Sequence, residues 1–194
     1  MNIGVIGAGN VGVTAAKLFA RAGHRVALSN SRGPDTLLKT VKELGPNVTA
    51  TTAEEAAAFG EVVLEAVPFG RYRDLPVDAL AGKIVVSASN YDPERDGPID
   101  FSGLTQSEFL ARHLSRSRVV KGFNTIFWED LRDQGTHSEP LINRRTILIA
   151  GDDPGAKAVV TELIEGIGFT AVDMGTLAHS QRLETGLHGR PHRL

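Results

Sequence analysis

The sequence predicts an α/β protein of the Rossmann type, with a doubly wound, mainly parallel sheet and a short C-terminal αβ elaboration. Short apolar runs rich in Val and Ile alternate along the chain with stretches of helical periodicity. A glycine pattern, Gly7–Gly12, follows the first apolar run directly. The 194 residues, 41% of them hydrophobic, are enough to bury one sizeable core. Strands and helices that alternate at this spacing indicate a parallel sheet covered on both faces.

The first part of the chain reads as a strand–helix alternation. We expect strands at Ile3–Ile6, Arg25–Asn30, Val48–Ala50 and Val62–Val67. We expect helices at Val11–Ala22, Thr36–Leu44 and Ala53–Phe59. The last of these helices carries its own start signal, because Thr52 can cap it and Glu55 stands where a capping-box partner belongs.

The second part continues the alternation with longer loops. Strands are expected at Lys83–Ala88, Val119–Phe123, Thr146–Ala150 and Phe169–Asp173. Helices are expected from Thr105 to about Leu114, at Phe127–Asp133 and at Pro154–Gly166. Irregular loops are expected at Asn90–Gly103 and Gln134–Asn143.

The composition excludes several classes of protein. Twenty-one basic residues against 23 acidic ones give a net charge of −2, which leaves no basic footprint for nucleic acid. The absence of cysteine excludes disulfides, thiolate nucleophiles and cysteine-bound zinc. The sequence has neither a signal-peptide pattern at its start nor an apolar run of membrane-spanning length. We therefore expect a cytoplasmic protein with no membrane partner.

The glycine turn is the sharpest functional signal. Gly7–Gly12 matches G-x-G-x-x-G and lies between an expected strand and helix, the context that the motif requires. Gly7 permits the tight turn, Gly9 lets the backbone approach a pyrophosphate, and Gly12 lets helix and strand pack closely. The amides of Asn10 and Val11 are expected nearest the phosphates. The alternative is a turn that serves only helix–strand packing.

The end of the second expected strand favours NADP over NAD. An NAD site usually carries an acid there that bonds the ribose 2′-hydroxyl, but here the first acid is Asp35, beyond the turn. Ser31 and Arg32 offer a hydroxyl and a guanidinium, which suit a 2′-phosphate, and Lys39 could add charge. The alternative is a solvated Arg32 in a protein that binds NAD.

These residues resemble a known family, the NADPH-dependent coenzyme F420 reductases (F420H2:NADP oxidoreductases). The resemblance spans most of the chain, and it rests on Gly7–Gly12, Ser29–Pro34, Ala66–Pro68, Val120–Ile126, Ala150–Asp153 and Gly168–Gly175. It implies that NADPH lies across the glycine turn and that hydride passes directly between the nicotinamide and a deazaflavin. It also implies a homodimer.

The resemblance also suggests roles for single residues. Gly9, Asn10 and Val11 would contact the pyrophosphate. Ser31 and Arg32 would hold the 2′-phosphate. Residues 67–69 would border the ribose and nicotinamide, and 124–126 would lie near the nicotinamide face. Together with the motif, these roles give a set of candidate cofactor-binding residues: Gly7, Gly9, Asn10, Val11, Gly12, Ser31, Arg32, Val67, Pro68, Phe69, Asn90, Asn124 and Thr125.

No side chain is predicted to be catalytic, because direct hydride transfer needs orientation rather than a nucleophile. Tyr72, Tyr91 and His113 could donate protons, but none belongs to a recognisable catalytic constellation, so we interpret them as structural. For Lys121, an ion pair or a solvent-exposed role is expected. Trp128, with Phe127 and Phe123, could form a substrate-facing apolar wall or a dimer contact, although a core role is favoured.

No metal site is predicted. The histidines outside the expected elements lack metal-ligand spacing, and we interpret them as surface or tail residues: His137, His179, His188 and His192. Asp152 and Asp153 stand before Pro154 and are expected to cap the helix that begins there.

The domain prediction is one NADP-binding unit over residues 1–194. It comprises a dinucleotide-binding core at 1–124, an extension at 125–185 and a flexible tail at 186–194. The predicted function is an NADP(H)-dependent oxidoreductase, with F420, a flavin-like ring or a small molecule as the second redox substrate. The alternative is a non-catalytic NADP sensor, in which cofactor binding changes a partner interaction.

Overall fold

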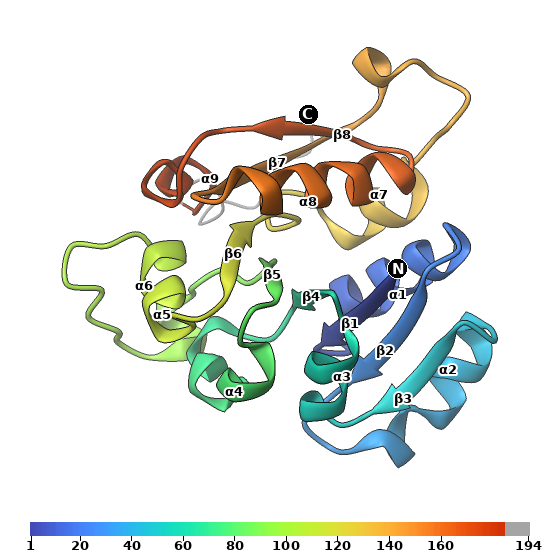
Figure 1. The fold of residues 1–194 in the computed structure, drawn as a ribbon, viewed down its shortest axis with the longest axis horizontal. Helices are drawn as coiled ribbons and strands as arrows, with labels where there is room; N and C mark the ends of the chain where they lie inside the picture. The colour runs from blue at the N-terminus through green and yellow to red at the C-terminus, as the bar shows by residue number, and fades with distance from the viewer. Residues whose placement is uncertain (185–194) are drawn as a thin grey trace.

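The structure is a computed structural model that describes residues 1–184, and the predicted flexible tail lies outside the described residues. Its centre is a sheet with the strand order β3-β2-β1-β4-β5-β6-β7-β8 (Figure 1). The strands are β1 (Asn2–Ile6), β2 (Arg25–Ser29), β3 (Val48–Thr51), β4 (Val62–Glu65), β5 (Ile84–Ser87), β6 (Arg118–Lys121), β7 (Thr146–Gly151) and β8 (Thr170–Asp173).

Helices connect and cover these strands. The α-helices are α1 (Asn10–Arg21), α2 (Leu38–Leu44), α3 (Ala53–Phe59), α4 (Val77–Leu80), α5 (Pro93–Asp96), α6 (Gln106–His113), α7 (Trp128–Asp133), α8 (Pro154–Gly166) and α9 (Gln181–Glu184). Short 3-10 turns lie at Pro34–Leu37, Phe69–Asp74, Leu141–Asn143 and Leu177–Ser180. No helix among residues 1–184 combines the length and the apolarity needed to cross a bilayer.

The topology confirms the predicted doubly wound Rossmann-type sheet. β1 lies between β2 and β4 and is parallel to both, so the chain first builds outward on one side of β1 and then on the other. Two apolar layers hold the helices: α1, α7 and α8 pack on one face, and α3, α4 and α6 on the other. Neighbouring residues of β4 divide between them, since Leu64 faces the first layer and Val63 the second. Ligands bind such sheets beside the carboxyl ends of the strands where the strand order reverses, here at β1 and β4.

The C-terminal elaboration joins the sheet differently from the other strands. β7 is antiparallel to β6 and pairs with it at only two positions, Val120↔Gly151 and Lys121↔Ala150. β8 is then parallel to β7, with α8 as the connecting helix. Because the two pairs are the last residues of β6, the β7–α8–β8 unit is attached at the carboxyl end of β6 and extends the sheet past that strand (Figure 1).

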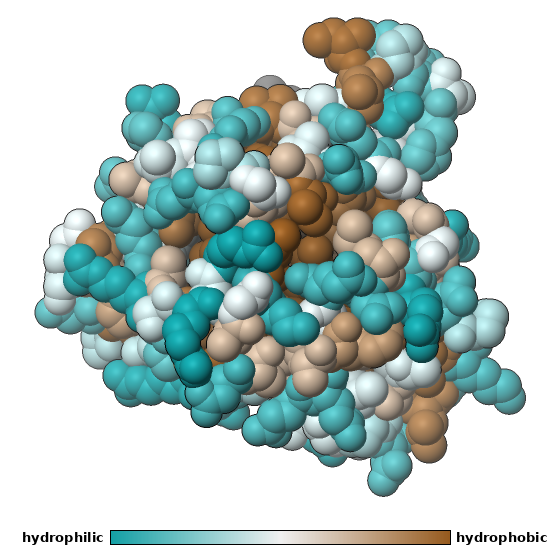
Figure 2. Space-filling model, viewed as in Figure 1, coloured by the Kyte–Doolittle hydropathy of each residue, from teal (hydrophilic) through white to brown (hydrophobic). Residues whose placement is uncertain are grey.

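Several local expectations are confirmed and others are wrong. Thr52 caps α3 through a capping box with Glu55, as predicted. The predicted loop 90–103 contains a turn of helix, α5, which Asp92 caps. The predicted loop 134–143 is an arm whose tip is a 3-10 turn, and Ile142 on that tip is 88% exposed. The arm projects from the upper right of the molecule, and its tip is apolar (Figures 1 and 2).

Candidate functional site

Two cavities lie at the carboxyl edge of the sheet, one on each side of the start of α1. The first, of about 730 Å³, we call the glycine groove; six predicted residues line it, namely Gly7, Gly9, Ser31, Arg32, Val67 and Pro68. The second, of about 310 Å³, we call the tryptophan chamber; four predicted residues line it, namely Val11, Asn90, Asn124 and Thr125. Gly9 is the N-cap of α1 and lines the groove, and Val11 in the first turn lines the chamber, so the start of α1 lies between the two cavities.

The glycine turn has the geometry that its sequence predicts. Gly7 adopts φ +112°, and a Cβ there would lie 2.4 Å from the carbonyl oxygen of Ala66. A Cβ on Gly12 would lie 1.9 Å from the carbonyl oxygen of Gly7, so α1 can pack this closely only with glycine at that position. A Cβ on Gly9 would meet nothing within 4 Å, which leaves its backbone open to the groove.

The start of α1 is suited to an anion. Its N-cap is Gly9, which offers no side chain to the free amides of the first turn. No acidic residue lies in that turn either. Unpaired amides and the positive end of the helix dipole therefore meet the boundary between the groove and the chamber. A phosphate group fits this environment.

The Ser31–Arg32 end of the groove is held in shape by its own turn. The Oδ1 of Asn30 accepts a hydrogen bond of 3.0 Å from the Arg32 amide, and its Nδ2 donates one of 2.9 Å to the Oγ1 of Thr36. Within residues 1–184, Arg32 forms no ion pair, so its guanidinium is available to a ligand. Lys39 does not line the groove. Its Nζ instead lies 4.0 Å from the Oε1 of Glu43.

The opposite wall of the groove contains charged residues that the sequence analysis missed. Arg71 and Asp74 line the groove and form an ion pair with each other. They lie on the 3-10 turn that follows β4. Their position after a strand was the available signal, because the carboxyl ends of parallel strands meet at one edge. The turn is too short to show helical periodicity.

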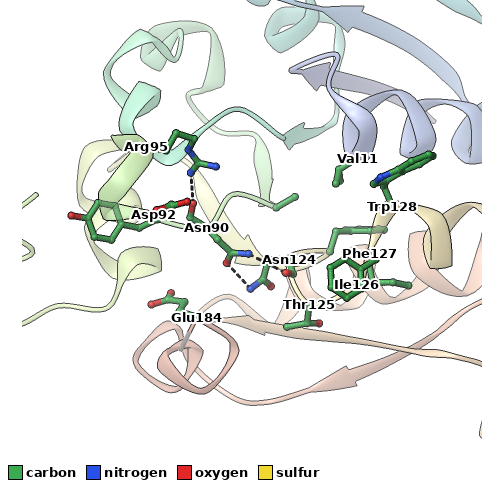
Figure 3. Close-up of a pocket in the computed structure, with 13 residues that line it drawn as sticks. Val11, Asn90, Asp92, Arg95, Asn124, Thr125, Ile126, Phe127, Trp128 and Glu184 are labelled. Atoms are coloured by element: carbon green, nitrogen blue, oxygen red, sulfur yellow. Dashed lines mark hydrogen bonds between the residues drawn. The ribbon is translucent and has the colours of Figure 1, made fainter. Parts of the chain in front are cut away.

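The tryptophan chamber has an apolar wall and a polar wall (Figure 3). The apolar wall comes from the start of α1, the segment before α7 and the first residue of α7: Val11, Ile126, Phe127 and Trp128. The polar wall includes three charged residues that the sequence analysis missed: Asp92, Arg95 and Glu184. Phe127 is 47% exposed and Trp128 is half-buried, and both line the chamber outside the two apolar layers, so the favoured core role is wrong for these two residues. It holds for Phe123, which is 1% exposed.

A strained backbone position leads into the chamber. Phe123 adopts φ +63°, which bulky residues rarely do. Its ring packs edge-to-face against Phe19, at a centroid distance of 6.1 Å, and this packing holds the conformation. The turn directs the following residue, Asn124, toward the chamber. Such outliers persist where surrounding packing over-determines them, and they cluster at functional sites.

Two asparagines form the floor of the chamber. The Nδ2 of Asn124 donates hydrogen bonds of 3.0 Å to the Oδ1 of Asn90 and 3.1 Å to the carbonyl oxygen of Leu183. The Nδ2 of Asn90 donates to the carbonyl oxygen of Asn124 at 3.0 Å. The two main-chain carbonyls fix both amide orientations, because a flipped amide would place oxygen against oxygen. The pair is therefore rigid.

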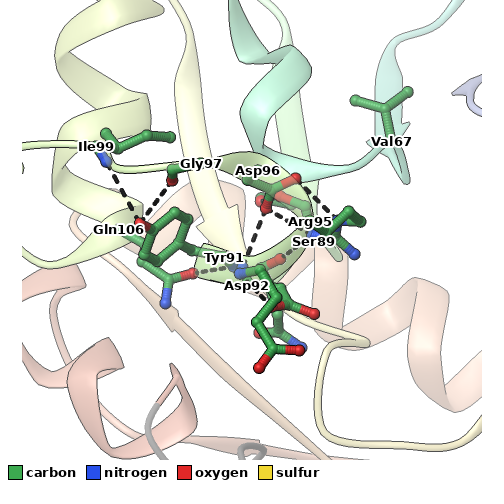
Figure 4. Close-up of polar contacts among 12 residues, drawn as sticks. Val67, Ser89, Tyr91, Asp92, Arg95, Asp96, Gly97, Ile99 and Gln106 are labelled. Carbon is green, nitrogen blue, oxygen red and sulfur yellow. Dashed lines mark hydrogen bonds and ion pairs between the residues drawn. The ribbon is translucent and has the colours of Figure 1, made fainter.

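The segment after β5 covers one side of the chamber. Arg95 donates to the carbonyl oxygen of Asn90 at 2.6 Å and holds both carboxylate oxygens of Asp96, at 2.8 and 2.7 Å (Figure 4). These hydrogen bonds raise the pKa of Arg95 and lower that of Asp96. The Tyr91 hydroxyl donates to the carbonyl oxygen of Gly97 at 2.8 Å, which confirms a structural role for this tyrosine (Figure 4).

The prediction for Phe69 is wrong for its side chain. It was predicted to border the cofactor, but it is 2% exposed and lies in an aromatic cluster of the second apolar layer. The cluster also holds Tyr72, Tyr91, Phe101 and Phe109. The chain turns after Pro68, and this turn directs the phenyl ring into the core instead of toward the groove. Asn10, at the start of α1, is exposed and lines neither cavity.

Lys121 matches neither of its two expectations. It is 1% exposed, so a solvent-exposed role is wrong, and within residues 1–184 it forms no ion pair either. Burial lowers its pKa to about 8, although the negative charges of Glu184 and Glu65 act in the opposite direction. Burial likewise raises the pKa of Glu65, against the effect of its hydrogen bonds to Ser87 and Ser89. A buried charged cluster therefore lies at the ends of the central strands.

Other candidates have structural roles. Tyr72 packs against His113, with ring centroids 5.1 Å apart. Asp153 caps α8, because its Oδ1 accepts from the amide of Ala156 at 2.7 Å, as predicted. Asp152 instead accepts from the amide of Leu177. His188 and His192 lie outside the described residues.

Comparison with known proteins agrees with this geometry. Residues 2–91 match the family model described as NADP oxidoreductase, coenzyme F420-dependent. The rat (Rattus norvegicus) Metalloreductase STEAP3 is 33% identical over 185 residues, which cover 94% of this chain and 35% of the relative. The chain thus spans about a third of the length of that curated relative.

Two solved structures are similar along nearly their whole length. The hypothetical protein SMa0349 from Sinorhizobium meliloti superposes with a TM-score of 0.84 at 31% identity, covering 98% of this chain and 92% of that one. A protein from Arthrobacter sp. FB24, described as a candidate F420-dependent NADP reductase, has a TM-score of 0.78 at 26% identity, covering 95% and 89%. Over residues 2–91 the chain is therefore similar to the coenzyme F420-dependent NADP oxidoreductases, and over nearly its whole length it is similar to these two structures.

Proposed function

We propose that this protein binds NADP(H) along the glycine groove and passes hydride between the nicotinamide and a second redox substrate in the tryptophan chamber. The carrying observation is that the start of α1, with a first turn free of acids and of a capping side chain, lies between the two cavities. A dinucleotide that crosses this turn would have its pyrophosphate on the open amides of Gly9, Asn10 and Val11. Its two ends would then enter different cavities.

In this proposal the chain's own residues orient the cofactor. Ser31 and Arg32 bind the 2′-phosphate, since the guanidinium carries no competing ion pair among residues 1–184. Val67 and Pro68 border the ribose. Bound NADPH supplies the hydride, so no nucleophilic side chain is needed. The remaining proposed contacts, in and beside the chamber, come from Asn90, Asn124 and Thr125.

The second substrate is proposed to be a planar acceptor such as F420 or a flavin. An apolar wall with Phe127 and Trp128 suits the face of a flat ring, and the polar wall opposite suits its heteroatoms. A homodimer, a cytoplasmic location and a single cofactor-binding unit over the described chain are further proposals, supported by the family resemblance. The tip of the 134–143 arm, with Ile142 exposed, is a candidate for the dimer contact.

The cofactor assignment is tested by calorimetric titration of the protein with NADPH and with NADH. We expect the wild type to prefer NADPH. Arg32→Ala should weaken NADPH binding by about ten- to a hundredfold, the loss of one charge-assisted phosphate contact, and leave NADH binding unchanged. Lys39→Ala is the matched control, because Lys39 lies near the same turn but outside the groove. Equal affinity of the wild type for both cofactors would contradict the proposal.

Turnover separates an enzyme from a sensor. NADPH is mixed with the protein and with F420, FMN, a quinone or a carbonyl compound, and the nicotinamide absorbance is followed. Oxidation of NADPH by any of them supports the oxidoreductase. Tight NADPH binding without turnover, together with a protein partner whose affinity depends on NADPH, supports the sensor instead.

A further inference from the structure

A buried cluster of three charged side chains lies beside the tryptophan chamber. Glu65, Lys121 and Glu184 are 2%, 1% and 4% exposed. Glu65 ends β4 and Lys121 ends β6, and both are in register with Ser87 of the intervening strand β5. Glu184 comes from α9, far along the chain, and also lines the chamber. The cluster joins the parallel sheet to the C-terminal part of the protein.

The cluster holds the segment that carries the chamber floor. The Nζ of Lys121 donates a hydrogen bond to the carbonyl oxygen of Ser89. The carboxylate of Glu65 accepts from the hydroxyl of Ser89 at 2.9 Å, and from the amide of Val67 at 3.1 Å. Ser89 is thus held at its side chain and at its main chain. The next residue is Asn90, so its position in the chamber depends on these contacts.

Glu184, on the polar wall, ties the chamber to the start of α6. Its carboxylate accepts hydrogen bonds of 3.0 Å from the main-chain amides of Gln106 and Ser107, the first two residues of α6. It also accepts one of 2.7 Å from the hydroxyl of Ser180. The negative charge of Glu184 also attracts Lys121. Lys121 therefore acts on two parts of the polar side of the chamber, on Ser89 through a hydrogen bond and on Glu184 through charge.

A buried charged cluster is an inefficient way to stabilise a fold. Removing charges from water offsets much of their mutual attraction, and apolar residues of similar volume often serve stability as well or better. In some proteins buried ionic groups instead specify one arrangement of the segments they hold, because a misplaced partner leaves a charge uncompensated. The arrangement specified here is that of Ser89–Asn90 and Glu184.

We propose that Lys121 is a positioning residue for the tryptophan chamber: through Ser89 and Glu184 it holds the polar wall in the arrangement that receives the nicotinamide end of the cofactor. This inference rests on the proposed function. It assigns no chemical step to Lys121, which does not line either cavity. The adenosine end, in the glycine groove, should be insensitive to Lys121.

The charge of Lys121 makes the arrangement sensitive to pH. The groups that face it are Glu65 from β4 and Glu184 from α9, and the chamber wall adds Asp92 and Arg95 from the α5 segment. With its pKa lowered to about 8, Lys121 loses its charge as the pH rises through that value. The two buried carboxylates then lack their cation, and the polar wall is expected to loosen.

The test compares two ligands in the same protein. Adenosine 2′,5′-bisphosphate carries the adenosine end of the cofactor without the nicotinamide, whereas NADP⁺ carries both ends. For Lys121→Met, we expect the affinity for NADP⁺ to fall about tenfold, one charge-assisted contact, while the affinity for the bisphosphate stays within about twofold of wild type. Lys83→Met is the matched control, since Lys83 is a lysine outside both cavities that bonds the carbonyl oxygen of Ala58.

A second arm uses unaltered protein. From about pH 7 to about pH 9.5, the ratio of the two affinities should change in the wild type and stay constant in Lys121→Met, because both ligands share the 2′-phosphate and its titration. If Lys121→Met does not fold, Glu184→Gln and the wild-type pH series replace it. Equal weakening of both ligands by the folded variant, or a pH-independent ratio in the wild type, overturns the inference. Failure of the wild type to bind either ligand would instead overturn the proposed function.

Discussion

The glycine groove and the tryptophan chamber are built by different means. The groove is lined by residues that all precede position 76, and its shape depends on backbone: a glycine at φ +112°, a second glycine in close contact, and an open helix start. The chamber draws on residues from Val11 to Glu184 and depends on side chains, among them a rigid amide pair and the buried charged cluster beside it. A backbone site is specified locally, whereas a side-chain site requires the whole fold.

This difference predicts where each kind of substitution acts. Small steric changes in the glycine turn should disturb the groove most. Changes of charge or of capping in the later elements should disturb the chamber most. The following predictions test that separation.

The largest effect is expected in the glycine turn. Gly12→Ala places a Cβ 1.9 Å from the carbonyl oxygen of Gly7, so α1 must move away from β1. We expect a loss of about 3 kcal/mol of unfolding free energy and no measurable NADPH binding. Urea unfolding and calorimetry measure the two quantities.

Gly9→Ala is the matched substitution. Its methyl group meets nothing within 4 Å, so stability should change by less than about 0.5 kcal/mol. NADPH affinity should still fall about tenfold or more, because the methyl group lies where a pyrophosphate would approach the backbone. Full NADPH affinity in Gly9→Ala would contradict the placement of the phosphates.

An effect of similar size is expected from the charge of Lys121. Burial lowers the pKa of this lysine from 10.5 to about 8, so between these values the unfolded chain binds more protons than the folded protein. Unfolding free energy should therefore rise with pH across this window, by up to about 3 kcal/mol, and Lys121 should contribute no pH dependence below it. Urea unfolding at about pH 7 and about pH 10 measures the rise.

Lys121→Met should lack this rise, which gives the control for every other group that titrates in the same window. The chamber and the fold should then respond to high pH in opposite directions: the fold gains stability and the nicotinamide end loses affinity. Parallel changes in both quantities would show that Lys121 affects the chamber only through overall stability.

The smallest effects are expected from the two matched capping boxes. Thr52 caps α3, whose first residue lines the groove, and Thr105 caps α6, whose first amides hold Glu184. Each substitution to Ala should lower unfolding free energy by about 1 kcal/mol. Only Thr105→Ala should also weaken NADP⁺ relative to adenosine 2′,5′-bisphosphate, as calorimetry with both ligands can show. An equal effect of Thr52→Ala on this ratio would remove the distinction between the two cavities.

The groove could be predicted from the sequence because its determinants are short-range. The spacing of Gly7, Gly9 and Gly12 after an apolar run specifies a turn, a helix start and a phosphate-sized opening. Arg32 was found because it follows the next strand. Arg71 was missed although it follows a strand in the same way, since nothing in its neighbourhood forms a motif.

The chamber could be predicted only in part. Asn124 and Thr125 were found through family resemblance, but Glu184 reaches the site through a unit whose attachment to β6 is antiparallel. No local sequence pattern predicts the antiparallel pairing of β7 with β6, because the arm between α7 and β7 separates the two strands along the chain. Burial of Lys121 was equally invisible, because a lysine in a strand gives no sign of the carboxylates that face it.

The distribution of lining residues along the chain also has a consequence for synthesis. Every residue of the groove has been translated by the time Leu75 is added, whereas the chamber needs Glu184, more than a hundred codons later. During this interval a growing polypeptide possesses one half of its site and lacks the other. A cofactor bound in the groove at that stage could react with a second substrate only after α9, which carries Glu184, has packed against the rest of the protein.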